Sequence, residues 1–72
     1  MSDQIKTKLQ LAVALHQAGR LADAQAIYQE VLTLDSKEFN SLHLSGVIAL
    51  QTGKLAEGLA LIDRAIAVNP GM

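Results

Sequence analysis

The two histidines of this sequence are its plausible general bases or metal ligands, and its four serines are candidate nucleophiles. His16 and His43 are well separated along the chain, and histidine is the residue that titrates near neutral pH. The serines, at positions 2, 36, 41 and 45, have no evident triad partners, and cysteine is absent. Two histidines without a nearby ligating carboxylate make a poor metal site. We therefore expect no catalytic residue, no metal and no cofactor, and the chain is not predicted to be an enzyme.

The charge balance and hydropathy narrow the class of partner. Six Lys or Arg face seven Asp or Glu, for a net charge of -1, so no basic patch is expected to bind nucleic acid. The longest apolar run, residues 11–15, is too short to span a membrane. The first four residues lack the basic and apolar regions of a signal peptide. Together with the absence of cysteine, these features predict a cytoplasmic protein.

Composition predicts an all-α fold. Half of the residues are hydrophobic, yet Tyr28 and Phe39 are the only aromatics, so aliphatic side chains and alanine must build the core. The single proline, Pro70, lies near the end and interrupts nothing before it. A chain of 72 residues has room for one small domain, predicted as residues 1–72.

An internal repeat becomes visible when the chain is compared with itself so that position 17 falls on position 51. The segment QAGRLAD, residues 17–23, then aligns with QTGKLAE, residues 51–57, and four of these seven positions are identical. Hydrophobic positions elsewhere also coincide, as for Val13 with Val47 and Leu32 with Ile66. The chain is therefore predicted to contain two copies of one supersecondary unit, at about residues 5–38 and 39–72.

Each unit is predicted to be a pair of antiparallel helices. Apolar residues recur at helical spacing over about residues 4–17, 21–34, 37–51 and 55–68. Gly19 and Gly53 stand where the first helix of each pair ends, and we expect positive φ angles at both. Asp35 with Glu38 is expected to cap the third helix as an acidic capping box, with Ser36 as the alternative cap.

These two units resemble the tetratricopeptide repeat, whose pattern is W-x2-L-G-x2-Y, then A-x3-F, a small residue and proline. The resemblance covers residues 5–72 as two full periods, although Lys8 and Leu42 stand where the tryptophan belongs. The remaining consensus positions hold Leu11, Ala12, Leu15, Ala24, Tyr28, Val31 and Ser36 in the first unit, and Gly46, Ala49, Gly58, Ile62, Ala65 and Pro70 in the second. Small residues at such positions allow close helix crossings, so we expect Ala24 and Gly58 to be buried. An ordinary four-helix bundle is the alternative fold.

The resemblance implies that the first helix of each pair lines a concave, protein-binding surface. Some relatives grip a partner's C-terminal carboxylate with lysines and asparagines, but this chain has Leu9, Val13 and Leu44 at those places. The groove is therefore expected to be mainly apolar, with an apolar or amphipathic protein segment as its partner. The alternative is that these residues pack against further repeats or a neighbouring domain. The expected groove residues are Lys6, Leu9, Val13, His16, Gln17, Asn40, His43, Val47 and Leu50.

The predicted function is a non-catalytic protein–protein interaction or scaffold module. The alternative is an N-terminal repeat region of a larger enzyme. Residues 45–53 and 61–70 look like repeats found at the N-termini of bacterial glycosyltransferase-like proteins, such as relatives of O-linked N-acetylglucosamine transferase. That resemblance implies that the repeats would position acceptor proteins. The fourth helix carries more apolar residues than one face against the third helix can bury, so Leu59 or Leu61 is expected in an exposed patch. Such a patch predicts a homo-oligomer formed through this helix, or a longer chain that covers it.

Overall fold

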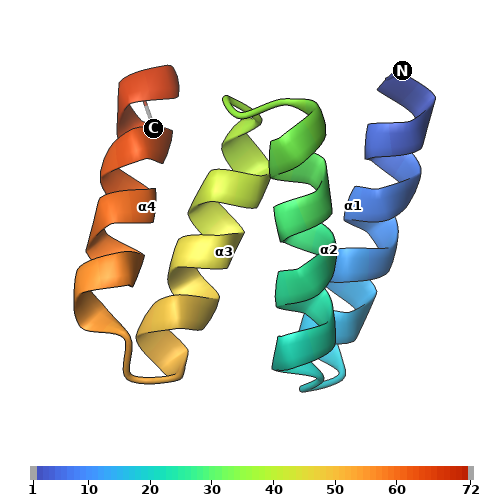
Figure 1. The fold of residues 1–72 in the computed structure, drawn as a ribbon, viewed down its shortest axis with the longest axis horizontal. Coiled ribbons are helices and arrows are strands. Elements are labelled where there is room, and N and C mark those ends of the chain that lie inside the picture. The colour runs from blue at the N-terminus through green and yellow to red at the C-terminus, as the bar shows by residue number, and fades with distance from the viewer. Residues whose placement is uncertain (1, 72) are drawn as a thin grey trace.

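The computed structural model describes residues 2–71, which form four helices. These are α1 (Ser2–Gln17), α2 (Leu21–Leu34), α3 (Phe39–Gln51) and α4 (Leu55–Val68). Each helix packs against the next one along the chain, and neighbouring helices run in opposite directions (Figure 1). The all-α prediction of two helical hairpins is confirmed, whereas the predicted domain and second repeat both end at residue 72, outside the described residues. Among residues 2–71, no helix has the length and apolar character that crossing a membrane would require.

The two hairpin turns are built in the same way. Gly19 and Gly53 have φ angles of 81° and 84°, the left-handed conformation that glycine adopts at little cost. In the first turn, the Arg20 amide donates to the Leu15 carbonyl at 2.9 Å and the Gly19 amide donates to the His16 carbonyl at 3.0 Å. Both bonds recur at the equivalent positions of the second turn. This is the Schellman arrangement, and the predicted glycine conformations are confirmed.

The turn between the hairpins differs from the sequence prediction. The α3 helix begins at Phe39, not at residue 37, and its N-cap is Glu38, so neither Asp35 nor Ser36 caps it. Glu38 Oε1 accepts a hydrogen bond from the Ser41 amide at 2.7 Å. The Asp35 carboxylate instead accepts from the Lys37 amide at 3.0 Å, within the turn. Because the extended backbone of Glu38 delays the helix, the longer glutamate side chain reaches the free amides of the first turn.

Small residues set the distance between the helices of each hairpin. Ala12 and Ala24 are fully buried where α1 meets α2, and glycine stands at both equivalent positions of the second hairpin. A Cβ atom added to Gly58 would lie 3.0 Å from the Gly46 carbonyl oxygen and 2.8 Å from Leu50 Cδ2. The backbones of α3 and α4 are therefore in contact, and the expected burial of Ala24 and Gly58 is confirmed.

The α2 and α3 helices join the two hairpins through apolar and polar contacts. Ile48 of α3 belongs to the same buried cluster as Ala24 and Tyr28 of α2. Beside this cluster, the buried Ser45 hydroxyl donates to Gln25 Oε1 at 2.9 Å and accepts from Gln29 Nε2 at 3.3 Å. The hairpins are thus fixed to each other by a packed and hydrogen-bonded interface.

Candidate protein-binding groove

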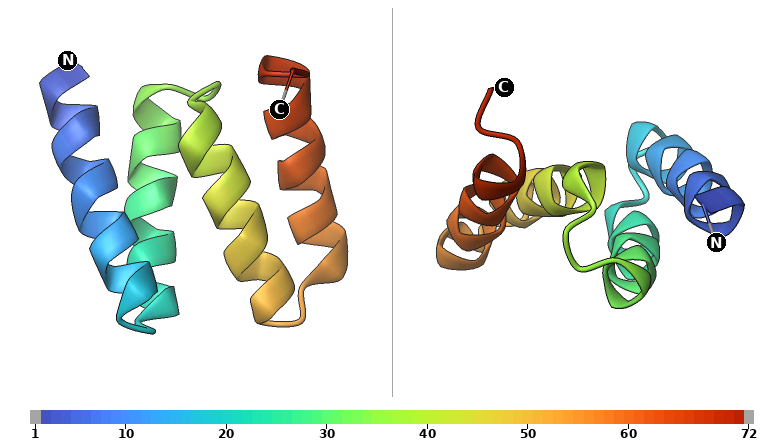
Figure 2. Two further views of the ribbon diagram at one scale, coloured as in Figure 1. Left: turned by 180° about the vertical axis from the view of Figure 1, so that it is seen from behind. Right: turned by 90° about the horizontal axis from the view of Figure 1, so that it is seen from above.

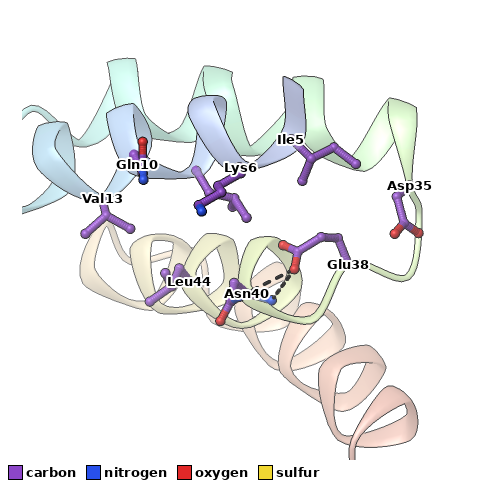
Figure 3. A pocket seen from close by; sticks show the side chains of 9 residues that line it. Ile5, Lys6, Gln10, Val13, Asp35, Glu38, Asn40 and Leu44 are labelled. Carbon is purple, nitrogen blue, oxygen red and sulfur yellow. Dashed lines mark hydrogen bonds between the residues drawn. The ribbon is translucent and has the colours of Figure 1, made fainter. Parts of the chain in front are cut away.

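A groove with a volume of about 780 Å³ lies between α1 and α3 (Figure 3). Seen from above, α2 is set back from the line between α1 and α3 (Figure 2, right). The residues that line the groove are Ile5, Lys6, Leu9, Gln10 and Val13 of α1, Asp35 and Glu38 of the inter-hairpin turn, and Asn40 and Leu44 of α3.

The apolar part of the groove rests on the protein core. Ile5, Leu9 and Val13 follow one another at intervals of four residues on α1, so they share one face of the helix. Leu9 also packs against the buried cluster that contains Tyr28, and so does Leu44 from the opposite wall. Leu9 and Leu44 are partly buried and held by the core, so the groove has a preformed apolar floor.

The two ends of the groove differ in polarity. Asp35 and Glu38 lie at the end where α1 begins, beside Ile5, whereas Val13 lies towards the other end (Figure 3). Both Glu38 oxygens accept backbone amides of α3, Oε1 from Ser41 and Oε2 from Asn40 at 3.3 Å. Lys6 is the cation along the α1 wall. The groove is therefore acidic at one end and carries Val13 and the uncharged Gln10 towards the other (Figure 3).

The buried Tyr28 lies close enough to the acidic end of the groove for the charge of Glu38 to change its pKa. Burial raises the pKa of Tyr28 above its ordinary value, and the negative charge of Glu38 raises this pKa further. Tyr28 Oη has no hydrogen-bond partner among residues 2–71. The tyrosine is thus held in its neutral form beneath the groove.

Four of the nine residues expected in the groove line it: Lys6, Leu9, Val13 and Asn40. The three apolar residues at the places of the carboxylate clamp, Leu9, Val13 and Leu44, all lie in its walls. The other lining residues, Ile5, Gln10, Asp35, Glu38 and Leu44, were not in the expected set. Ile5 could have been predicted from the sequence, because it precedes Leu9 by the same four residues that separate Leu9 from Val13.

The remaining five expected residues lie outside the lining of this groove. His16 Nε2 is 3.0 Å from Gln51 Oε1, a hydrogen bond between the last turns of α1 and α3, and Gln17 is exposed beside it. Val47 is partly buried. Leu50 packs against the backbone of α4 at Gly58, so part of its side chain is used within the second hairpin.

The two histidines have separate environments. His43 is exposed, and its ring stacks on Phe39 with a centroid distance of 5.7 Å and an interplanar angle of 17°. His16 is instead engaged with Gln51. Within residues 2–71, no three His, Asp or Glu side chains come together in a way that would hold a metal ion.

Comparison with known proteins identifies the first hairpin. Residues 5–38 match the tetratricopeptide repeat family. A stretch of 53 residues is 38% identical to the cellulose synthase operon protein C of Komagataeibacter xylinus and covers 74% of this chain. The chain spans only 4% of the length of that relative. With the same turn, crossing and packing repeated in the second hairpin, the chain is a tetratricopeptide repeat protein.

Proposed function

We propose that the groove between α1 and α3 binds an amphipathic segment of a partner protein. Tetratricopeptide repeats generally mediate protein–protein interaction or scaffolding. The observation that carries the proposal is the preformed apolar floor of Leu9 and Leu44, open to solvent between two helices. An apolar strip of a partner that enters this groove removes apolar surface of both proteins from water.

Charge gives the partner a preferred direction. Asp35 and Glu38 stand at one end of the groove and Val13 towards the other. A partner segment with apolar residues at helical spacing and a lysine or arginine near one end would place its cation beside the two carboxylates. Rim charges of this kind contribute mainly to orientation and association rate, whereas the apolar contacts supply most of the affinity.

A random peptide library displayed on phage, selected against the 72-residue chain, tests the proposal. We expect enriched peptides with apolar residues at helical spacing and a basic residue near one end. For a synthetic peptide of the enriched sequence, Val13→Lys should weaken binding about tenfold or more, because loss of one apolar contact costs about 1.5 kcal/mol. Fluorescence anisotropy measures the dissociation constant.

Ala26→Lys is the matched control, because Ala26 lines the hollow between α2 and α3 outside this groove. It adds the same charge and should leave the dissociation constant unchanged. Equal weakening by both variants would assign the effect to charge alone. If the Val13→Lys variant keeps its helical circular dichroism and binds the peptide as well as the unsubstituted chain, this groove is not the binding site.

The chain is also proposed to associate with itself through α4, where Leu55, Leu59, Ile66 and Val68 are exposed. This refines the sequence prediction, because Leu59 lies in the exposed patch while Leu61 is buried in the cluster with Leu42 and Ala65. The role as a repeat region of a glycosyltransferase-like enzyme stays a prediction. A cytoplasmic location also stays a prediction.

A further inference from the structure

The outer face of α4, defined here as Leu55, Leu59 and Ile66, carries three large apolar side chains that are each more than half exposed. The three positions follow one stripe of the helix, at intervals of four and seven residues. Helix α4 lies at one end of the array and α1 lies at the other (Figure 1). This end of the molecule thus presents an apolar stripe that the packing of residues 2–71 leaves largely uncovered.

The equivalent stripe of α2, one repeat earlier in the chain, consists of Leu21, Gln25 and Leu32 and holds α3. Gln25 accepts the hydrogen bond of Ser45. Leu21 packs on the cluster that contains Ile48, and Leu32 packs on the cluster that contains Leu42. The face of α2 that is equivalent to the outer face of α4 therefore packs against α3, the first helix of the next hairpin.

The other half of that interface is repeated on α1. Ser45 and Ile48 of α3, with Thr52 just after it, correspond to Leu11, Ala14 and Ala18, which are defined here as the outer face of α1. All three are exposed, Leu11 by 53%. The protein therefore presents, at its two ends, the two halves of the interface that joins α2 to α3 in its middle.

We propose that copies of this chain associate head to tail, with the outer face of α4 in one copy packed against the outer face of α1 in the next. In this contact, Leu59 meets Leu11 at the place where Gln25 meets Ser45 within one chain. Two exposed leucines replace a hydrogen-bonded polar pair, so the intermolecular contact gains from apolar burial. The contact goes beyond the peptide groove and uses different residues.

Charges beside the two leucines fit the same arrangement. Asp63 lies one helical turn after Leu59 on α4, and Lys8 lies about one turn before Leu11 on α1. Helix α4 of one copy and α1 of the next would run antiparallel, as α2 and α3 do. Asp63 and Lys8 would therefore lie on the same side of the pair formed by Leu59 and Leu11. Lys8 also pairs with Glu30 of its own chain at 2.8 Å, so Asp63 would be a second carboxylate beside one ammonium group. This attraction across the contact favours the register.

The contact uses two different surfaces, so it is heterologous and leaves one free face on each end of the assembly. Further copies add in the same way and continue the solenoid. A symmetric dimer formed by two α4 helices would instead use one surface twice and stop at two copies. The two arrangements make opposite predictions for a substitution in α1.

Analytical ultracentrifugation of two single variants, Leu11→Glu and Leu59→Glu, tests the proposal. The unsubstituted chain is expected to show a mass that rises with concentration above 7.7 kDa. Each variant alone lacks one face of the contact and should remain at 7.7 kDa. Mixed in equal amounts, the intact α4 face of Leu11→Glu should bind the intact α1 face of Leu59→Glu and give a complex of twice 7.7 kDa that does not grow.

Leu34→Glu is the matched control, since Leu34 is also exposed but belongs to neither outer face. It should associate like the unsubstituted chain, as should Val13→Lys in the groove, so this result is independent of peptide binding. A strictly monomeric unsubstituted chain at about millimolar concentration, the weak limit of useful affinity, would overturn the proposal. So would normal association of Leu11→Glu alone, or the absence of a complex in the mixture when both variants keep their helical circular dichroism.

Discussion

Glu38 combines three roles at one position of the chain. Its carboxylate caps α3 by accepting the amides of Asn40 and Ser41, it lines the acidic end of the groove, and its charge disfavours ionisation of Tyr28. The negative charge is also favourable at the positive end of the helix dipole. Glu38 therefore both caps the first helix of the second hairpin and contributes negative charge to the acidic end of the groove.

Tyr28 provides a test of this local environment, because it is the only tyrosine in the chain. Its phenol is more acidic in the unfolded chain, with an ordinary pKa of 10.0, than in the folded protein, where burial and Glu38 raise the pKa. Above pH 10 the unfolded state therefore loses a proton that the folded state still holds. The free energy of unfolding should fall as the pH rises past this value.

Tyr28→Phe removes this titration and also removes a buried hydroxyl without a partner among residues 2–71. At pH 7 we expect the variant to be as stable as the unsubstituted chain, within about 1 kcal/mol, or more stable. Above pH 10 the variant should lose less stability, as measured by urea unfolding followed by circular dichroism. Equal losses in both proteins would show that Tyr28 titrates alike in the folded and unfolded states.

At the scale of the helices, the crossing of the second hairpin is built from two buried glycines. Gly46 and Gly58 replace the alanines Ala12 and Ala24 of the first hairpin, and the backbones of α3 and α4 touch at these glycines. Gly58→Ala places a Cβ atom 3.0 Å from a carbonyl oxygen and 2.8 Å from Leu50. Overpacking of this kind should destabilise the protein by about 1–3 kcal/mol, despite the better helix propensity of alanine.

The thermal melting temperature measures this effect, with Gly71→Ala as the control. Among residues 2–71, a Cβ atom on Gly71 would meet only the Asn69 side chain, at 3.7 Å, so the control should melt like the unsubstituted chain. An unchanged or raised melting temperature for Gly58→Ala would show that the hairpin can open by a few tenths of an ångström at no cost.

The helices themselves follow from local signals, which is why the sequence predicts them well. The turns at Gly19 and Gly53 require a residue that tolerates positive φ, and the match between the two repeats places both. The predicted start of α3 differs from the observed start by two residues, because Asp35, Ser36 and Glu38 are all chemically able to cap a helix. Only the path of the turn decides which carboxylate reaches the free amides.

The groove was harder to predict than the helices because it depends on how two helices face each other. The repeat pattern assigns Leu9 and Val13 to the concave side. It cannot show that Asp35 and Glu38 reach the same groove from the turn, since their positions depend on the angle between the hairpins. Leu50 illustrates the converse case: it was predicted to line the groove, but its side chain packs against the backbone of α4 at Gly58, which has no side chain of its own.

At the scale of the whole molecule, the packing of residues 2–71 leaves the outer faces of α1 and α4 exposed at the two ends of the array. The stability of repeat arrays is approximately the sum of the stability of each unit and the interface between neighbours. Residues 2–71 contain one such interface between hairpins, α2 with α3, so a monomer of these two hairpins is expected to be only marginally stable. Each further hairpin that covers an outer face adds one interface.

A covalent tandem tests whether the two outer faces fit each other without any dependence on concentration. Joining position 5 of a second copy directly after position 72 of the first preserves the repeat period, because position 5 is the repeat equivalent of position 39, where the second unit begins. We expect this tandem to unfold in one cooperative transition and to resist urea better than the single chain. Burial of Leu59 against Leu11 alone should add about 2 kcal/mol.

Leu59→Glu in the first copy of the tandem supplies the control, because it disrupts the new interface and leaves every other contact in place. This variant should lose most of the added stability and unfold in two separable transitions. The same substitution in the second copy lies at the free end of the array, where no helix covers it, so it should have little effect. A tandem that unfolds at the same urea concentration as the single chain, whichever copy carries the substitution, would show that the outer faces of α4 and α1 do not form an interface.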